Sequence, residues 1–293
     1  MQNNLYQWPC ANAIYPDRGN KSYRFKRLRF RLRSLMNLRS VQAFEQYVNQ
    51  NPDLAAFLNT RANYSYPLVH RFLDKRFNAK QRYQAMVDNL TFLPKSLWQQ
   101  SISFGEVVPE FSLYLNINEQ QPMEGFWALE LRHSETNQLI YVLTFGKLAD
   151  SLLIAVIQGP NFDGSKELVK KLTKKCHGLR PAYLMVECMK ALTRVLGYST
   201  LLGIPQKYQN KSRLIQSKRY VVDYDAIFSE SGASLAEYWL LPLALNNKDL
   251  SDIPSNKRSM YRKRYAMLEQ IQAAMHEQLA GLQAVHIEPK SAN

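Results

Sequence analysis

The sequence holds few of the residues that cross-link or interrupt a chain. Its three cysteines, Cys10, Cys176 and Cys188, form no CxxC pair, so we expect reduced thiols in a cytoplasmic protein rather than a disulfide framework. Glycine, with 11 residues, and proline, with 13, are too scarce for a linker-rich or low-complexity chain. The longest apolar run, residues 152–157, is far shorter than the roughly 20 residues that span a bilayer. These absences predict a soluble or peripherally membrane-bound protein.

The motifs that mark common metal, cofactor and nucleic-acid sites are absent as well. The histidines and cysteines do not have the spacing of metal ligands, and there is no GxSxG, P-loop or Rossmann fingerprint. No helix-turn-helix, zinc-finger or RNP-like motif occurs. The first residues lack the positive flank and apolar run of a secretory signal. The sequence therefore predicts no metal site, and it specifies neither a reaction nor an oligomeric state.

Positive charge is abundant and concentrated near the two ends of the chain. The net charge is +14, with 38 Lys and Arg against 24 Asp and Glu. Residues 18–39 hold nine cations and no acid, namely Arg18, Lys21, Arg24, Lys26, Arg27, Arg29, Arg31, Arg33 and Arg39. Residues 257–264 hold five more, namely Lys257, Arg258, Arg262, Lys263 and Arg264. The middle of the chain is close to balanced, so anionic partners are expected at these two clusters.

The first cluster has the pattern of an amphipathic helix. Phe25, Leu28, Leu32 and Leu35 recur at three-to-four spacing, which predicts one helix over 22–48 with an apolar stripe and a basic face. Such a helix can lie on anionic lipid, where each nearby cation contributes about 1 kcal/mol. It can equally pack on its own domain with the basic face in water. A third reading is nucleic acid, because aromatic residues between the cations could stack on bases.

The order of expected elements indicates an α+β fold. We predict helices at 54–58, 79–90, 165–176, 181–196 and 257–280, extended segments at 102–117 and 207–224, and strands at 126–132, 139–146, 152–157 and 200–204. Asn78 is the expected cap of the second of these helices, and Gly197 ends the helix at 181–196. The chain divides into a helical region at 1–100, a mixed core at 101–250 and a basic C-terminal helix at 251–293 that packs on the core.

Three motifs resemble the VirK/YbjX family of Gram-negative bacteria. They are IQGP (157–160) with HGLRPAYLMVE (177–187), YDAIF (224–228) and IPSNKRSMYRKRYAMLE (253–269). Their order and spacing agree with that family over roughly residues 60–275. The resemblance implies a role in virulence, cell-envelope integrity and tolerance of cationic antimicrobial peptides. With the basic helix, it places the protein in the cytoplasm or on the cytoplasmic face of the inner membrane.

The order of hairpin, strand, helix and strand over 126–204 is similar to the core of acetyl-CoA-dependent N-acyltransferases. In those enzymes a helix N-terminus binds the cofactor diphosphate, because unpaired N–H groups and the helix dipole favour an anion. The resemblance implies a mixed sheet flanked by helices, and acyl-CoA or CoA as cofactor. The usual glycine-rich loop is missing, since Gly178 is the only glycine at that turn and Pro181 lacks an N–H donor. Two hypotheses follow: an acyl-CoA-dependent enzyme, or a non-catalytic binding or regulatory protein of the same fold.

The predicted ligand site combines the family motifs with the second basic cluster. The candidate binding residues are Gln158, Gly159, Pro160, Gly178, Arg180, Arg258, Arg262 and Arg264. We expect them to border one pocket for a phosphate-bearing or acyl-CoA-like anion, because the planar guanidinium makes paired hydrogen bonds to phosphate. Cations at a helix start also oppose its dipole by about 0.3–1 kcal/mol each, a cost that a bound anion would offset. The competing interpretation is a solvated helix start capped by Ser255.

Three residues are candidate general bases, and each has a structural alternative. Glu130 and Glu187 stand in apolar segments, where a carboxyl group can have a raised pKa. Either could instead pair with a neighbouring Lys or Arg. His177 follows Cys176 directly, but adjacent residues on a helix do not face each other, so a Cys–His pair is not expected. The alternative for His177 is a turn-forming role.

Overall fold

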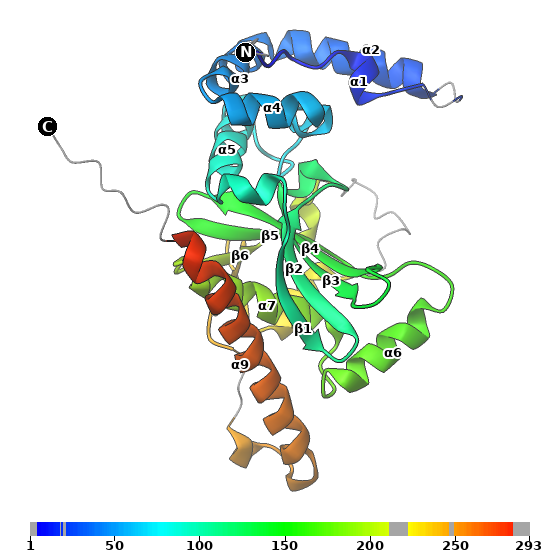
Figure 1. Ribbon diagram of the computed structural model, residues 1–293, viewed down its shortest axis with the longest axis vertical. Helices are drawn as coiled ribbons and strands as arrows, with labels where there is room; N and C mark the ends of the chain where they lie inside the picture. The colour runs from blue at the N-terminus through cyan, green and yellow to red at the C-terminus, as the bar shows by residue number, and fades with distance from the viewer. Residues whose placement is uncertain (1–4, 18, 20–21, 211–221, 246–248, 284–293) are drawn as a thin grey trace, which may run out of the picture.

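The structure, a computed structural model, describes residues 5–17, 19, 22–210, 222–245 and 249–283. It combines a helical N-terminal region, a central sheet and a long closing helix (Figure 1). The α-helices are α1 (Ala11–Ile14), α2 (Ser22–Met36), α3 (Leu38–Asn49), α4 (Pro52–Thr60), α5 (Ala79–Thr91), α6 (Ser165–Lys175), α7 (Pro181–Val195), α8 (Tyr224–Glu230) and α9 (Ser255–Gln283). The short 3-10 helices are η1 (Ala62–Tyr64), η2 (Tyr66–Val69), η3 (Lys95–Trp98), η4 (Pro122–Glu124), η5 (Gln206–Tyr208) and η6 (Leu250–Asp252). The predicted α+β class is confirmed.

Within the described residues, the sheet has eight strands in the order β1-β2-β3-β4-β5-β6-β8-β7. The strands are β1 (Ile102–Val108), β2 (Phe111–Ile117), β3 (Trp127–His133), β4 (Leu139–Leu148), β5 (Ser151–Gln158), β6 (Leu201–Gly203), β7 (Ser234–Leu235) and β8 (Trp239–Leu241). Neighbours are antiparallel except β5 and β6, which are parallel and joined through α6 and α7. The pairing runs from Leu152 with Leu201 to Ile154 with Gly203, so only the first half of β5 has a parallel partner.

Where the β5–β6 ladder ends, side chains donate hydrogen bonds to the remaining carbonyl groups of β5. The carbonyl oxygen of Ala155 accepts a hydrogen bond from the Gln209 side-chain amide at 3.3 Å. The carbonyl oxygen of Ile157 accepts one from the Tyr224 hydroxyl at 2.8 Å. Because buried carbonyl groups need partners, these two side chains hold the second half of β5 in place.

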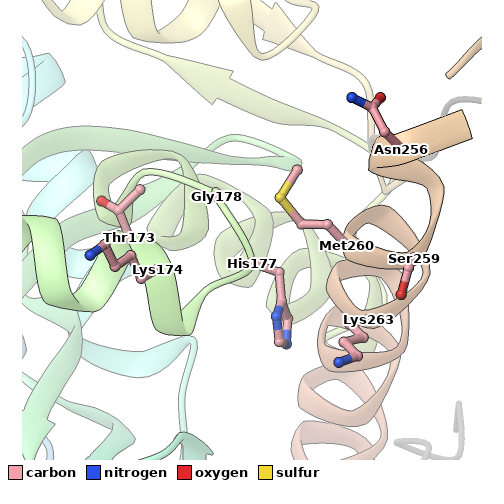
Figure 2. A pocket seen from close by; sticks show the side chains of 8 residues that line it. All are labelled: Thr173, Lys174, His177, Gly178, Asn256, Ser259, Met260 and Lys263. Carbon is pink, nitrogen blue, oxygen red and sulfur yellow. The ribbon is translucent and has the colours of Figure 1, made fainter. Parts of the chain in front are cut away.

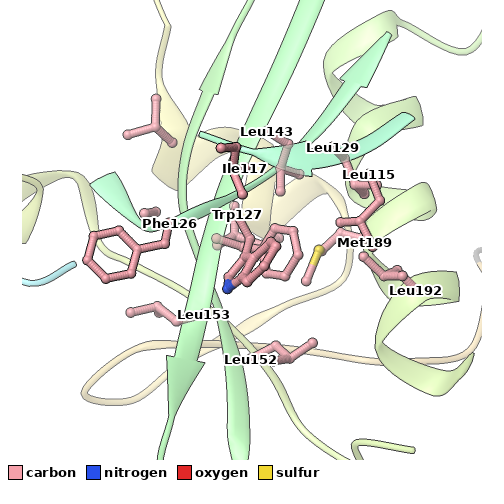
Figure 3. Packing of buried hydrophobic residues seen from close by; sticks show 14 of the residues in the cluster. Leu115, Ile117, Phe126, Trp127, Leu129, Leu143, Leu152, Leu153, Met189 and Leu192 are labelled. Carbon is pink, nitrogen blue, oxygen red and sulfur yellow. The ribbon is translucent and has the colours of Figure 1, made fainter. Parts of the chain in front are cut away.

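One part of the core lies between the sheet and α7, and the same buried cluster continues into the N-terminal helical region. Strand alternation puts Trp127, Leu129 and Leu131 of β3 on one face, in register with Ile117, Leu115 and Leu113 of β2. Met189 and Leu192 of α7 pack against this face (Figure 3). Leu184, Cys188 and Leu192 of α7 are buried, and Val195 at the end of the same stripe is half-buried. Helix α9 in turn packs against α7 and β1 through Leu268, Ile271, Met275 and Leu279.

One buried amide joins the helical region to the sheet. Asn89 of α5 accepts a hydrogen bond from the Lys147 N–H at 2.7 Å and donates to the Lys147 carbonyl at 2.8 Å. Its own carbonyl accepts from Trp127 Nε1 at 2.9 Å. The Asn89 side chain thus pairs with β4 as another strand would. Gly146 leaves the space for it, because a Cβ there would lie 2.6 Å from the amide oxygen.

Most expected elements are present, with one break and several omissions. The capping box of Asn78 and Gln81 begins α5, and Gly197 ends α7 in a left-handed conformation. The single helix predicted over 22–48 is wrong, because Asn37 (φ −113°, ψ 24°) separates α2 from α3 and bonds its side chain to the Arg33 carbonyl. Helix α8 and strands β7 and β8 were not predicted.

Most of the extended arm predicted at 207–224 lies outside the described residues, which stop at 210 and resume at 222. Within the described part of the chain, no helix combines the length and apolar character that crossing a bilayer requires.

Candidate functional site

The turn between α6 and α7 is built on two consecutive residues with positive φ. His177 (φ 51°) and Gly178 (φ 76°) end α6. The Gly178 N–H donates to the Thr173 carbonyl at 2.9 Å, and the His177 N–H donates to the Lys174 carbonyl at 3.1 Å. This is the Schellman arrangement, in which a left-handed residue lets the last carbonyl groups of a helix find donors. The predicted turn-forming role of His177 agrees with this geometry.

Helix α9 crosses this turn at close range. Arg264 donates from Nε and Nη2 to the carbonyl oxygen of His177, at 3.2 and 2.7 Å. A Cβ on Gly178 would lie 3.1 Å from the Arg264 guanidinium and 3.2 Å from the Met260 sulfur. Glycine is therefore favoured at this position for two reasons: it adopts the left-handed backbone conformation, and it leaves room for α9.

An open pocket lies between the end of α6 and the first turns of α9 (Figure 2). Its volume is about 520 Å³, and its lining residues are Thr173, Lys174, His177, Gly178, Asn256, Ser259, Met260 and Lys263. His177 and Lys263 extend into the space between the turn and α9 (Figure 2). None of these eight described residues is acidic, so the pocket is electropositive.

The electrostatics of His177 reflect these neighbours. Partial burial lowers the pKa of its imidazole, and the charges of Lys263 and Arg264 lower this pKa further. The neutral imidazole therefore predominates at pH 7. It offers one donor and one acceptor nitrogen to a ligand in the pocket.

The structure brings together part of the predicted site. His177 and Gly178 of the HGLR motif meet Lys263 and Arg264 of the second basic cluster. Arg258 belongs to the same cluster but serves the chain itself, donating to the carbonyl oxygens of Ile253 at 2.9 Å and Ser251 at 3.3 Å. Arg262 is exposed and does not line the pocket.

The other predicted binding residues lie apart from this pocket. Arg180 is exposed at the start of α7, where its guanidinium lies 5.8 Å from the centre of the Tyr183 ring. Gln158, at the end of β5, donates to a Glu124 carboxylate oxygen at 3.3 Å. Gly159 faces the Tyr141 ring, which a Cβ would approach to 2.8 Å. Pro160 follows it in the loop before α6, and none of these residues lines the pocket.

The two candidate glutamates are held by basic partners. Glu130 accepts from Arg132 Nε at 2.9 Å, and Asn116 lies 3.4 Å away. Glu187 forms a buried ion pair with Lys190 at 2.8 Å. Cys176, next to His177, is fully buried, and burial raises the pKa of its thiol to about 12, so it is a poor nucleophile. No group of three or more His, Cys, Asp or Glu among the described residues could hold a metal ion.

Several pocket residues carried no signal in the sequence. Lys174 was one cation among several in a basic amphipathic helix. Asn256 and Ser259 were polar residues of a helix start. Only the crossing of α9 over the turn gives these side chains a common pocket, and spacing along the chain does not encode that crossing.

The fold and the pocket define an α+β protein with a basic pocket beside a Schellman turn. Comparison with known proteins gives the family: the chain belongs to the family described as "Protein of unknown function (DUF535)", whose model matches residues 19–277. YbjX of Escherichia coli K12 is 23% identical over 280 residues, covering 87% of this chain and 84% of YbjX. The resemblance to the VirK/YbjX family is therefore confirmed.

Two other relatives are more similar. A protein of Haemophilus influenzae, described as uncharacterised, is 59% identical over 281 residues, 94% of this chain and 96% of the relative. A Mannheimia haemolytica protein named "Membrane protein LapB" is 67% identical over 215 residues, 71% of this chain and 96% of LapB. No solved structure matches the chain.

Proposed function

We propose that this protein acts in maintenance of the bacterial cell envelope by binding a phosphate-bearing anion in the pocket between α6 and α9. The observation that carries the proposal is the meeting of Lys174, His177 and Lys263 in one pocket with no acidic lining residue. The family resemblance connects such proteins with envelope integrity, virulence and tolerance of cationic peptides. A relative named as a membrane protein supports a place at a membrane.

The pocket has the chemistry that phosphate requires. Lysine residues of two different helices line it, and Asn256 and Ser259 add neutral donors. Asn256 stands in the first turn of α9, where the helix dipole favours an anion, and Ser259 follows directly after that turn. Binding alone is sufficient for this proposal, which requires no catalytic base.

The test is isothermal titration calorimetry of the protein with inorganic pyrophosphate. Lys174→Gln combined with Lys263→Gln should weaken binding about tenfold, because each exposed ion pair contributes up to about 1 kcal/mol. Lys257→Gln combined with Arg262→Gln is the matched control, since it removes two charges from α9 outside the pocket. If the control and the pocket variant lose the same affinity for pyrophosphate, the loss reflects net charge alone, and the proposal fails.

The imidazole of His177 provides a second, independent test of the proposal. A bound anion favours the imidazolium form, so the pKa of His177 should rise when sulfate, which stays dianionic across this range, is added. NMR titration of the His177 ring with and without sulfate measures this change. An unchanged His177 pKa at saturating sulfate would place the anion elsewhere.

A second candidate function is acyl-CoA-dependent transfer, favoured by the parallel β5–β6 pair with α7 between its strands. In this hypothesis Arg180, at the start of α7, would bind the CoA phosphates. A ligand at about 100 times its dissociation constant stabilises a protein by about 2.7 kcal/mol, which raises the melting temperature measurably. We expect such a rise with acyl-CoA and its loss in Arg180→Ala. If CoA and acyl-CoAs leave the melting temperature unchanged, the transferase hypothesis is wrong and the pocket proposal is unaffected.

A further inference from the structure

Helix α2 turns its large apolar side chains away from the protein. The exposed fractions are 68% for Phe25, 54% for Leu28, 53% for Leu32, 68% for Leu35 and 84% for Met36. We call these five residues the outer stripe. Single exposed apolar residues are ordinary on a protein surface, but a contiguous row of large ones marks an interaction site.

A different face of the helix is buried. Phe30, 3% exposed, stacks on Trp8 with the ring centres 6.1 Å apart, and Trp8 Nε1 donates to the Ser34 hydroxyl at 3.1 Å. Arg27 donates from Nε to the Tyr15 carbonyl at 2.8 Å. Arg27, Phe30 and Ser34 follow helical spacing, so they form one inner face. At about 100° per residue the outer stripe is centred opposite Phe30, and it therefore cannot be the face that holds α2 to the protein.

Cations border the outer stripe on both sides. By the same helical geometry, Arg24 and Arg31 flank it on one side and Arg29 on the other, and all three are exposed. No acidic residue occurs in α2. An apolar stripe between two rows of arginines is the pattern of a helix that lies in the plane of a membrane interface. There the long side chains reach the lipid phosphates while the apolar groups enter the acyl boundary.

We infer that α2 is a membrane-docking helix that lies flat on an anionic bilayer, with the outer stripe among the upper acyl chains and Arg24, Arg29 and Arg31 on the headgroup phosphates. Charge decides between this occupant and a second copy of the chain. A two-fold contact through α2 would bring the two sets of arginines together without any compensating acid, whereas an anionic bilayer neutralises both flanks. Nucleic acid would neutralise the arginines but leave the leucines in water.

The observations behind this inference do not involve the phosphate pocket. A bilayer bound to α2 nevertheless limits which ligands can reach that pocket. Helix α2 lies across one end of the long axis of the molecule, and the first turns of α9, which line the pocket, lie at the opposite end (Figure 1). A bilayer on the outer stripe is therefore remote from the pocket. The pocket ligand is then a soluble phosphate compound and not a lipid of the same bilayer.

The test measures binding of the full-length protein to vesicles by flotation. Vesicles of phosphatidylglycerol and phosphatidylethanolamine should bind the protein, and vesicles of phosphatidylcholine should bind it at least tenfold less. Leu28→Ser combined with Leu32→Ser should lower binding to the anionic vesicles at least tenfold. Replacing Arg24, Arg29 and Arg31 with Gln should lower it by about fivefold per cation, with a weaker dependence on salt.

The matched control removes two exposed apolar residues elsewhere. Phe162 and Leu240 are 41% and 47% exposed, so Phe162→Ser combined with Leu240→Ser should leave vesicle binding unchanged. The Leu28 and Leu32 variant should also unfold at the same denaturant concentration as the parent, because both side chains are largely in water already. A marked loss of stability would give the stripe a structural role and overturn the inference.

Three further outcomes would overturn it. One is failure of the parent protein to bind anionic vesicles. Another is unchanged binding by the Leu28→Ser, Leu32→Ser variant, which would reduce the contact to surface charge. The third is a dimer in sedimentation experiments that this variant converts to a monomer without any vesicle binding, which would assign the stripe to a second copy of the chain.

Discussion

Replacing Lys190 with methionine should destabilise the protein by about 3–5 kcal/mol, because it removes one partner of a buried ion pair. The Lys190 side chain is fully buried and that of Glu187 is 4% exposed, with the charged groups 2.8 Å apart. Lys190 Nζ also donates to the Ser231 carbonyl at 3.2 Å. Without the ammonium group, a carboxylate remains in the interior with its main counter-charge gone. Urea unfolding followed by circular dichroism measures the loss.

The chain contains a matched control for this prediction. Glu167 and Lys170 form an ion pair at the same i,i+3 spacing and nearly the same distance, 2.7 Å, but their side chains are 75% and 69% exposed. Lys170→Met should therefore cost less than about 1 kcal/mol. Replacing both Glu187 and Lys190 with methionine should recover much of the loss, because an apolar pair leaves no isolated charge. A Lys190 variant as mild as the Lys170 variant would contradict the prediction and show that the interior tolerates the Glu187 carboxyl group without this ion pair.

Gly125→Ala should destabilise the protein by about 3 kcal/mol or more, through strain and overlap together. Gly125 has φ 113° and ψ 153°, a region that only glycine occupies readily, and strain of this kind costs about 1–3 kcal/mol. A Cβ there would lie 2.4 Å from the carbonyl oxygen of Phe145 and 2.8 Å from its carbonyl carbon. Phe145 is in β4 and pairs with Trp127 of β3, so neither backbone can withdraw without breaking the ladder.

A second glycine separates the cost of backbone strain from the cost of steric overlap. Gly164 also has a positive φ, +85°, but a Cβ there would meet nothing within 4 Å. Gly164→Ala should therefore cost only the left-handed conformation, about 1–2 kcal/mol. Equal costs at the two positions, measured by the same unfolding experiment, would show that the sheet relaxes around the new methyl group.

Local chemistry made much of this fold predictable. The capping pair of Asn78 and Gln81, the stop at Gly197 and the alternation along β3 each act within a few residues, so the pattern and the element coincide. The break at Asn37 depends on a side-chain bond to the Arg33 carbonyl, which competes with the continuing helix and has no periodic signature. Strands β7 and β8, with two and three residues, are too short for alternation to appear.

The candidate site was harder to predict than the fold. The sequence pointed to the HGLR turn and the second basic cluster, and Arg264 does meet His177. Arg258 bonds main-chain carbonyl groups, whereas Lys263 lines the pocket. The sequence could not distinguish these two roles, because both residues belong to the same helix. The same difficulty affects α2, since apolar spacing identified the outer stripe but not which way it faces. The inner-face contacts of Arg27, Phe30 and Ser34 decide that, and all three residues stand outside the apolar repeat.

The amide of Asn89 has a mechanical consequence. It bonds both main-chain groups of Lys147, and Trp127 bonds its carbonyl oxygen, so α5 and the sheet are linked through three hydrogen bonds at one residue. A hinge at this junction would have to break several buried bonds at once, and such bonds are costly to leave unmade. The helical region and the sheet therefore tilt together. If α2 binds a membrane as proposed, the helical region and the sheet keep one orientation relative to that membrane. The Asn89 junction therefore fixes the distance and the angle between the membrane surface and the distant pocket.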